Sequence, residues 1–291
     1  MAGRESQVVL GVDPDPAALW PDRGAAPAHG TPAQRAAGAV VAHCRALIDA
    51  TAQACVAVKL QLACFERLGA PGWTALEDVA AHARTRGLLV IADGKRGDIS
   101  LSAGAYAQAL LGGVETPFGT VEGLGADLVT VNPLMGSDAL EPFVAAARSA
   151  GAGVLVLVRT SNPGAADVED LELDGGGTVW ERVASIVAEL GRPGVGAAGL
   201  SDVGAVVGAT VPRHLERARE LMAHATFLLP GVGAQGGRVE DLAPAFAPGP
   251  AGGLVAASRS IAEAHRASGG EPAAAARAEA ERLREAAWAL S

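Results

Sequence analysis

The hydrophobic positions of this chain gather into short continuous runs separated by longer, alanine-rich segments. The runs are rich in Val, Leu and Ile, and they are continuous rather than alternating, which is typical of parallel strands covered by helices on both faces. Eight such runs are predicted as strands, at residues 8–12, 54–60, 88–92, 128–131, 154–158, 203–207, 226–229 and 254–257.

Helix-like segments lie between these runs. Two of them, at 178–190 and 214–224, carry apolar residues at the 3.6-residue helical spacing. Eight strands that alternate with helical segments predict an α/β fold with a single (β/α)8 TIM barrel over residues 1–291, with a short N-terminal tail and an Ala-rich C-terminal helix at 272–290. Loops are expected at 14–31 and 191–199. The helices are predicted at 32–51, 74–86, 100–111, 138–149, 178–190 and 214–224.

Composition narrows the function classes. With 291 residues, 49% of them hydrophobic, the chain can bury a large core. It has no apolar stretch of membrane-spanning length and a polar N-terminus, so we expect no membrane association and a cytoplasmic location. Three cysteines without CxxC spacing are expected to be reduced thiols. A net charge of −9 without a basic run argues against nucleic acid as a partner.

Polar residues follow almost every predicted strand, where a barrel enzyme builds its active site. The chain has only two asparagines, Asn132 and Asn162; both follow strands and both precede proline, so each is either a binding residue or the start of a turn. The other polar residues that follow strands are Asp13, Lys59, Asp93, Lys95, the segment 159–162, the glycine-rich loop 231–237 and Arg259.

Lysine is rare here: Lys59 and Lys95 are the only two, beside 21 arginines. An ammonium group can release a proton, whereas a guanidinium in practice cannot. Asp93 and Lys95, two positions apart on a strand, can face the same side. We therefore expect an alternating ring of Lys59, Asp93, Lys95 and Asp98, in which the carboxylates keep the lysines charged. A Schiff-base lysine would need the opposite pKa shift.

The glycine-rich loop formally matches the GxGxxG dinucleotide pattern through Gly231, Gly233 and Gly236. We reject that interpretation because the loop follows the seventh strand instead of opening a βαβ unit. Loops after the last two barrel strands commonly bind phosphate through backbone N–H groups. With Arg259 as a bidentate partner, the loop predicts a phosphorylated substrate.

The six histidines fall in predicted loops or helices without metal-ligand spacing, and GxSxG, Walker A and HExxH motifs are absent from the sequence. We therefore expect chemistry that depends on Lys and Asp, with no metal and no cofactor.

Seven segments, in order between about residues 8 and 262, carry a family resemblance: VLGVDPD (9–15), VK (58–59), DGKRGDI (93–99), VNPLMG (131–136), VRTSNPG (158–164), PGVGAQGG (230–237) and SRSI (258–261). They resemble the orotidine 5′-phosphate decarboxylase family in its longer bacterial subfamily. The combination of DxKRGDI with PGxGAQGG is highly specific.

The resemblance implies a homodimeric barrel that converts orotidine 5′-phosphate to uridine 5′-phosphate and CO2, the last step of UMP synthesis, without a cofactor. It implies that Lys95 is the proton donor, with Asp93 against the leaving carboxylate and Asp98 reaching across the dimer into the partner's site. For substrate binding, it implies that Lys59 and Asp13 hold the ribose and that Ser161, or else Thr160, reads the pyrimidine. Gln235 would bridge base and phosphate, and Arg259 would bind the phosphate together with the amides of Gly233 to Gly236. The other implied substrate-binding residues are Ser102, Asn132 and Pro230.

Two features depart from the family pattern: Ser102 stands where the family usually has Thr, and the segment 61–66 differs from the usual sequence. Three alternatives remain open. They are a metal-dependent decarboxylase or aldolase of the same barrel group acting on a sugar phosphate, a Schiff-base aldolase, and a nucleotide-sensing barrel without catalytic activity.

Overall fold

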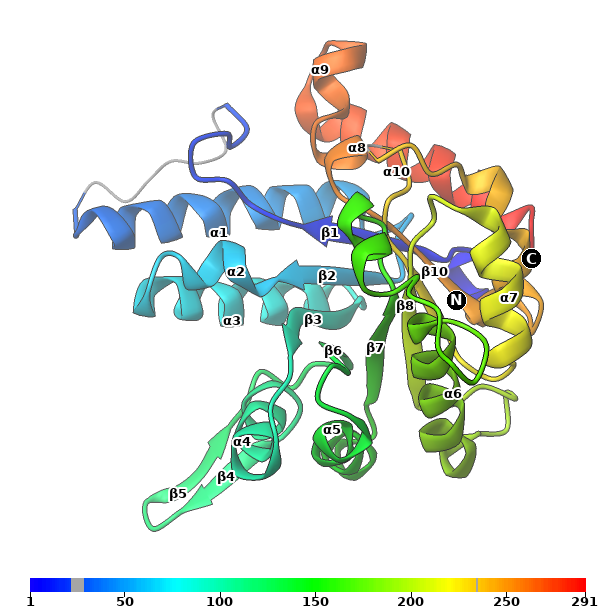
Figure 1. The fold of residues 1–291 in the computed structure, drawn as a ribbon. Helices are drawn as coiled ribbons and strands as arrows, with labels where there is room; N and C mark the ends of the chain where they lie inside the picture. Colours follow the sequence, from blue (N-terminus) through cyan, green and yellow to red (C-terminus); the bar gives the residue numbers. More distant parts are fainter. Residues whose placement is uncertain (22–28, 234) are drawn as a thin grey trace.

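The computed structural model describes residues 1–21, 29–233 and 235–291, so part of the expected loop 14–31 and Ala234 of the glycine-rich loop lie outside the described residues. Eight parallel strands close into a barrel with helices around it, which confirms the predicted fold (Figure 1). Around the barrel the strands are ordered β1 (Val8–Val12), β10 (Gly253–Ala257), β9 (Phe227–Leu229), β8 (Val203–Val207), β7 (Gly153–Arg159), β6 (Leu128–Val131), β3 (Leu89–Arg96) and β2 (Ala57–Gln61).

All eight predicted strands are present, with ends that differ by a few residues. The second strand begins at Ala57 because Ala54 still belongs to the turn that ends the first long helix, its N–H donating to Thr51 O. The third strand is longer than its hydrophobic run and continues to Arg96, so it carries Asp93 and Lys95 as strand residues.

The long helices also follow the prediction closely, whereas three short helices, one after β2 and two after β10, were not predicted. One exception is α3, which begins at Ala70 rather than residue 74 because Pro71 fits the first helical turn and Gly69 takes a positive φ before it. The helices are α1 (Pro32–Thr51), α2 (Leu62–Glu66), α3 (Ala70–Thr85), α4 (Ser100–Leu110), α5 (Ser137–Ala150), α6 (Val179–Gly191), α7 (Pro212–Leu221), α8 (Arg259–Ala262), α9 (Ala264–Ser268) and α10 (Pro272–Trp288). Short 3-10 helices cover Ala2–Arg4, Pro163–Asp167, Arg192–Gly194, Val239–Phe246 and Pro250–Gly252.

An antiparallel hairpin between α4 and β6, formed by β4 (Gly113–Thr116) and β5 (Gly119–Glu122), was not predicted. It projects away from the barrel (Figure 1), and its tip residue Phe118 is almost fully exposed. It has no continuous buried face, so the hydrophobic pattern gave no sign of it.

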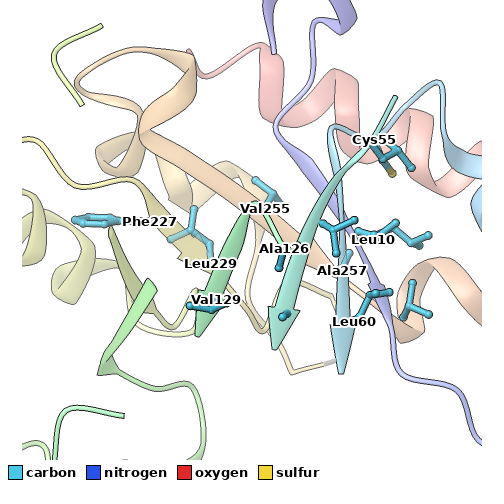
Figure 2. Close-up of a cluster of buried hydrophobic side chains, with 14 of the residues drawn as sticks. Leu10, Cys55, Leu60, Ala126, Val129, Phe227, Leu229, Val255 and Ala257 are labelled. Atoms are coloured by element: carbon cyan, nitrogen blue, oxygen red, sulfur yellow. The ribbon is translucent and has the colours of Figure 1, made fainter. Parts of the chain in front are cut away.

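Two buried clusters form the core. One fills the inside of the barrel and includes Val9, Ile91 and Leu155. The larger one lies between the strands and the surrounding helices; Figure 2 shows part of it, including Leu10 of β1 and its pairing partner Ala257 of β10. These layers hold the strand ends, and therefore the site, in fixed positions.

The C-terminal Ala-rich helix is present as α10, whose small buried residues Ala276 and Ala280 pack toward the core. Among the described residues, no helix has the length and hydropathy needed to cross a bilayer.

Candidate active site

A cavity of about 520 Å3 opens at the carboxyl ends of the barrel strands. Its floor is apolar, formed by residues such as Leu157, Val206 and Leu228, and its walls are polar. Of the residues predicted from the sequence, it brings together Asp13, Lys59, Asp93, Lys95, Thr160, Ser161, Pro230, Gln235 and Arg259.

Asp93 lies at the centre of a charged cluster within this cavity. Its Oδ2 accepts a hydrogen bond from Lys59 Nζ at 2.7 Å, and its Oδ1 accepts one from Lys95 Nζ at 2.6 Å. Thr130 Oγ1 donates to the same Oδ1 at 2.9 Å. Lys59 Nζ also lies 3.5 Å from Asp13 Oδ1. Three members of the predicted ring, Lys59, Asp93 and Lys95, are therefore linked. Asp13, which was not part of that ring, extends the cluster at the Lys59 end, so the charges form an open chain from Asp13 to Lys95.

The strand register creates this arrangement. β2 and β3 pair in parallel with Gln61 opposite Asp93, which brings Lys59 and Asp93 to neighbouring positions at the cavity. Gln61, two residues after Lys59 on the same face, donates from Nε2 to Asp93 Oδ2 at 3.3 Å. Gln61 was not among the residues predicted from the sequence, although its spacing of two residues from Lys59 on the same strand was a usable signal.

The electrostatics of the cluster favour its charged form. Burial alone would raise the pKa of Asp93, but the ammonium groups of Lys59 and Lys95 outweigh it and lower that pKa to about 2. Burial would likewise lower the pKa of Lys59, but the carboxylates of Asp93 and Asp13 overcome it and raise that pKa. The carboxylate and the buried ammonium therefore stabilise each other as an ion pair.

Lys95 has an unusual backbone. Its φ is +47°, in the left-handed region that non-glycine residues rarely adopt, and the pairing of β3 with β6 shifts register between Ala92 and Arg96. Its N–H donates to Thr130 Oγ1 at 2.9 Å, which holds this conformation. Both lysines line the cavity, and the Lys95 side chain is 45% exposed against 9% for Lys59, so Lys95 is the more accessible of the two ammonium groups.

Five of the predicted site residues are not among those that line the cavity: Asp98, Ser102, Asn132, Gly233 and Gly236. Asp98 does not join the expected ring within the chain: its Oδ1 accepts only from the N–H of Ile99, at 2.8 Å, and it forms no ion pair with any residue that the structure describes. Asn132 Oδ1 accepts from Leu134 N at 3.0 Å, which is the turn-starting role left open by the sequence. Ser102 is exposed on α4.

The glycine-rich loop forms the opposite wall. Gly231, Gly233 and Gly236 all have positive φ, between +75° and +103°, so the loop needs glycine at these positions. Gln235 Oε1 accepts a hydrogen bond from Ser161 Oγ at 2.6 Å, which links this loop to the loop after β7. Arg259 at the start of α8 lines the cavity and forms no ion pair within the described parts of the chain.

The loop after β7 is held by acidic residues that were not predicted from the sequence. Arg159 donates from Nε and from its second terminal nitrogen to the two oxygens of Asp170, each at 2.8 Å. Glu169 lines the cavity and accepts from Thr160 N at 2.8 Å and Thr160 Oγ1 at 2.9 Å. The only signal in the sequence was that Glu169 and Asp170 are neighbours about ten residues after Arg159. Contacts within a loop leave no hydrophobic periodicity from which they could be predicted.

No cluster of three or more His, Cys, Asp or Glu side chains suited to a metal ion occurs in residues 1–21, 29–233 and 235–291. The cavity instead combines a lysine–aspartate cluster with a glycine-rich loop and an unpaired arginine. Fold and site together define the class: a (β/α)8-barrel enzyme with its reactive groups at the carboxyl ends of the strands.

Comparison with known proteins gives the family. Residues 7–278 match the profile of the orotidine 5′-phosphate decarboxylase / HUMPS family. The chain is 45% identical over 233 residues to orotidine 5′-phosphate decarboxylase of Rhodopirellula baltica, covering 79% of this chain and 75% of that protein. It is 49% identical over 216 residues to the Deinococcus radiodurans enzyme of the same name, covering 74% of each.

A solved structure agrees with the sequence relatives. The OMP decarboxylase structure from Leishmania donovani superposes with a TM-score of 0.69 at 30% identity, covering 98% of this chain and 96% of that chain. The chain therefore belongs to the orotidine 5′-phosphate decarboxylase family.

Proposed function

We propose that this chain decarboxylates orotidine 5′-phosphate to uridine 5′-phosphate and CO2 in pyrimidine synthesis, with Lys95 as the proton donor and without a cofactor. The single observation that carries the proposal is the contact of Lys95 Nζ with Asp93 Oδ1, 2.6 Å, at the wall of the cavity. Family membership supports the substrate and the reaction.

The substrate is proposed to span the cavity from the glycine-rich loop to the lysine–aspartate cluster. Arg259 binds the phosphate, since it has no competing ion pair among the described residues. The N–H groups of Gly233 and Gly236 donate to Gly237 O and Gly233 O, each at 2.9 Å, so their proposed contacts with the phosphate require these bonds to exchange when the substrate binds. Lys59 and Asp13, which lie 3.5 Å apart, bind the ribose hydroxyls.

The pyrimidine is proposed to contact Ser161 and Gln235, whose side chains already hydrogen-bond to each other. Thr160 is a weaker candidate because Glu169 occupies both its N–H and its hydroxyl. Pro230 lines the cavity beside the base. Ser102 and Asn132, which lie outside the cavity walls, are assigned no direct contact here.

The chemistry follows from the charge that develops. Breaking the bond between C6 and the carboxylate releases CO2 and leaves an electron pair on C6 in the plane of the ring, where the π system cannot delocalise it. The Lys95 ammonium stabilises this charge electrostatically and then transfers its proton to C6, which gives uridine 5′-phosphate. The resulting neutral amine regains a proton from water.

Asp93 has two parts in this scheme. It holds both ammonium groups through its two oxygens, and the Asp93 carboxylate, ionised because its pKa is about 2, faces the substrate carboxylate. Departure of CO2 removes the substrate carboxylate, and with it the repulsion between that carboxylate and Asp93. This repulsion is weaker in the transition state than in the bound substrate, so it favours the transition state.

We also propose a homodimer in which Asp98 completes the partner's site. Large apolar side chains are exposed near Asp98, among them Leu101 at 87% and Leu134 at 81%, beside Ile99 and Met135. Exposed apolar residues clustered around a polar site residue are typical of a subunit interface. The proposal further includes one catalytic domain over residues 1–291 and a cytoplasmic location, where Cys44, Cys55 and Cys64 stay as thiols.

The test is a spectrophotometric assay with orotidine 5′-phosphate in the presence of EDTA. We expect loss of orotidine absorbance with the wild-type chain and almost none with Lys95→Ala. Activity abolished by EDTA would favour the metal-dependent decarboxylase or aldolase, and binding of uridine 5′-phosphate without any absorbance change would favour a nucleotide sensor. Covalent trapping by borohydride with substrate would indicate a Schiff-base enzyme and contradict the proposed role of Lys95.

A further inference from the structure

Trp20 lies where the first and last barrel loops meet. It follows Asp13 in the segment after β1, and its side chain is buried, with 4% exposure. Its indole Nε1 donates to the carbonyl oxygen of Ala262 at 2.8 Å. Ala262 ends α8, the helix that begins with Arg259. One side chain therefore connects the loop that carries Asp13 to the short helix that carries Arg259.

The indole is fixed by its surroundings. Its ring packs edge-on against His43 of α1, with centroids 5.2 Å apart, and against His265 of α9, at 6.4 Å. The backbone N–H of Trp20 donates to His43 Nδ1 at 3.2 Å, and burial lowers the pKa of His43 to about 4, so this acceptor stays neutral near pH 7. Trp20 is thus held from two helices as well as by its own hydrogen bond.

Below Trp20 the two loops leave adjacent, tightly packed strands. β1 and β10 pair with Leu10 opposite Ala257, and a side chain on Gly11 would collide with Ser258. Above this point a cavity of about 70 Å3 separates the loops, and Asp13, Trp20 and Arg259 all line it. Because the strands no longer hold the loops together at this level, the Trp20–Ala262 bond is a main constraint on their spacing.

We propose that Trp20 is a positioning residue that sets Arg259 against the Asp13 loop, so that phosphate and ribose are bound in one fixed spacing. This inference rests on the proposed function, specifically on Arg259 as the phosphate ligand. Trp20 itself does not line the main cavity, so it acts through Ala262 and α8 rather than by touching the substrate.

The test compares Trp20→Phe, which keeps an aromatic ring but removes the N–H donor, with Trp180→Phe. Trp180, on α6, is also buried, at 4% exposure, but it packs against His214 of α7, far along the chain from the Asp13 loop. The measurement is the inhibition constant of uridine divided by that of uridine 5′-phosphate, a ratio that reports the contribution of the phosphate to binding. It is made together with kcat and KM.

We expect Trp20→Phe to lower this ratio by about tenfold, the scale of one buried hydrogen bond, and to raise KM much more than it lowers kcat. Trp180→Phe should leave the ratio unchanged. In an Arg259→Ala background, Trp20→Phe should have no further effect on the ratio, because its action passes through Arg259. His43→Leu should lower the ratio in the same direction, whereas His43→Asn, which keeps an acceptor, should largely preserve it.

A wild-type ratio in Trp20→Phe, or an effect that simply adds to that of Arg259→Ala, would overturn the inference while leaving the proposed function intact. If Arg259→Ala itself bound uridine 5′-phosphate as tightly as the wild type, the proposed phosphate site would be wrong, and the role of Trp20 would fall with it.

Discussion

The two aspartates of the Asp93-to-Asp98 motif lie five residues apart in the chain and in opposite environments. Asp93 is buried and accepts hydrogen bonds from Lys59, Lys95, Gln61 and Thr130. Asp98 is half-buried, lies outside the cavity and accepts only from the N–H of its neighbour Ile99. Both oxygens of the Asp93 carboxylate are hydrogen-bonded within a single chain, whereas the Asp98 carboxylate has no ionic partner among the described residues.

Asp93 represents the charged groups that already pair within the folded chain. Asp98 represents the groups that are proposed to contact a ligand or a second subunit. A buried charge must be paired, so Asp93 needs its two lysines whether or not substrate is bound. Asp98 and Arg259 are solvated enough to remain unpaired within the described residues, and the proposed function gives each of them a partner that binds from outside the chain. The variants below test the two groups separately.

The largest effect is expected from Lys95→Arg. The guanidinium keeps the charge beside Asp93 but is larger and is not a usable acid, so kcat/KM should fall by a factor on the order of 10^4. The measurement is orotidine 5′-phosphate turnover, with Arg45→Lys at the exposed Arg45–Asp78 pair as a substitution control. Turnover close to wild type in Lys95→Arg would rule out proton donation by this residue.

Asp98→Asn is expected to lower kcat/KM by about 10^2, the scale of one electrostatic contact to the transition state. If Asp98 serves the partner's site, mixing Asp98→Asn with Lys95→Ala should restore about a quarter of wild-type activity, because half of the dimers are mixed and each has one complete site. If Asp98 acts within its own chain, both sites of a mixed dimer are defective and the mixture stays inactive.

The sequence was sufficient to predict the barrel because each strand is a continuous apolar run flanked by a helical segment. It also predicted most of the cavity wall, since residues such as Lys59, Asp93 and Arg259 directly follow or end those runs. Strand ends converge in a barrel whatever the loop sequences are, so this part of the site depends only on locating the strands.

Other features could not be predicted because they depend on contacts without a periodic signal. The β4–β5 hairpin has mostly exposed residues, and therefore no hydrophobic pattern. Glu169 reaches Thr160 only because the loop after β7 folds back. The different environments of Asp93 and Asp98 depend on the extension of β3 to Arg96, well past its apolar run. The hydrophobic pattern before Asp93 does not predict this extension.

Arg259→Ala tests the unpaired cation at the other end of the cavity. If Arg259 contacts the phosphate, its removal should raise KM about 50-fold, the scale of hydrogen bonds to a charged group, with a smaller change in kcat. Stability should hardly change, since the guanidinium forms no ion pair with the residues described here. Arg159→Ala is the matched contrast: its guanidinium is bound to Asp170, so a loss of stability is expected as well.

The smallest effect expected is the pH dependence of the assembled cluster. Because the folded pKa of Asp93, about 2, lies below the ordinary value of 3.8, the unfolded chain takes up this proton at a higher pH than the folded chain. The stabilisation is therefore complete above about pH 4 and is lost as the pH falls toward 2, on the order of 2 kcal/mol in total. Denaturant unfolding at a series of pH values measures it.

Asp93→Asn should remove this acid-dependent loss, whatever its effect on stability at neutral pH. His43 supplies an internal reference, because burial lowers its pKa from 6.5 to about 4 and the resulting loss of stability falls in that higher pH range in both proteins. The same slope between pH 4 and 2 in wild type and Asp93→Asn would mean that Asp93 is not an ionised partner of the two lysines. The distinction between a paired Asp93 and an unpaired Asp98 would then no longer hold.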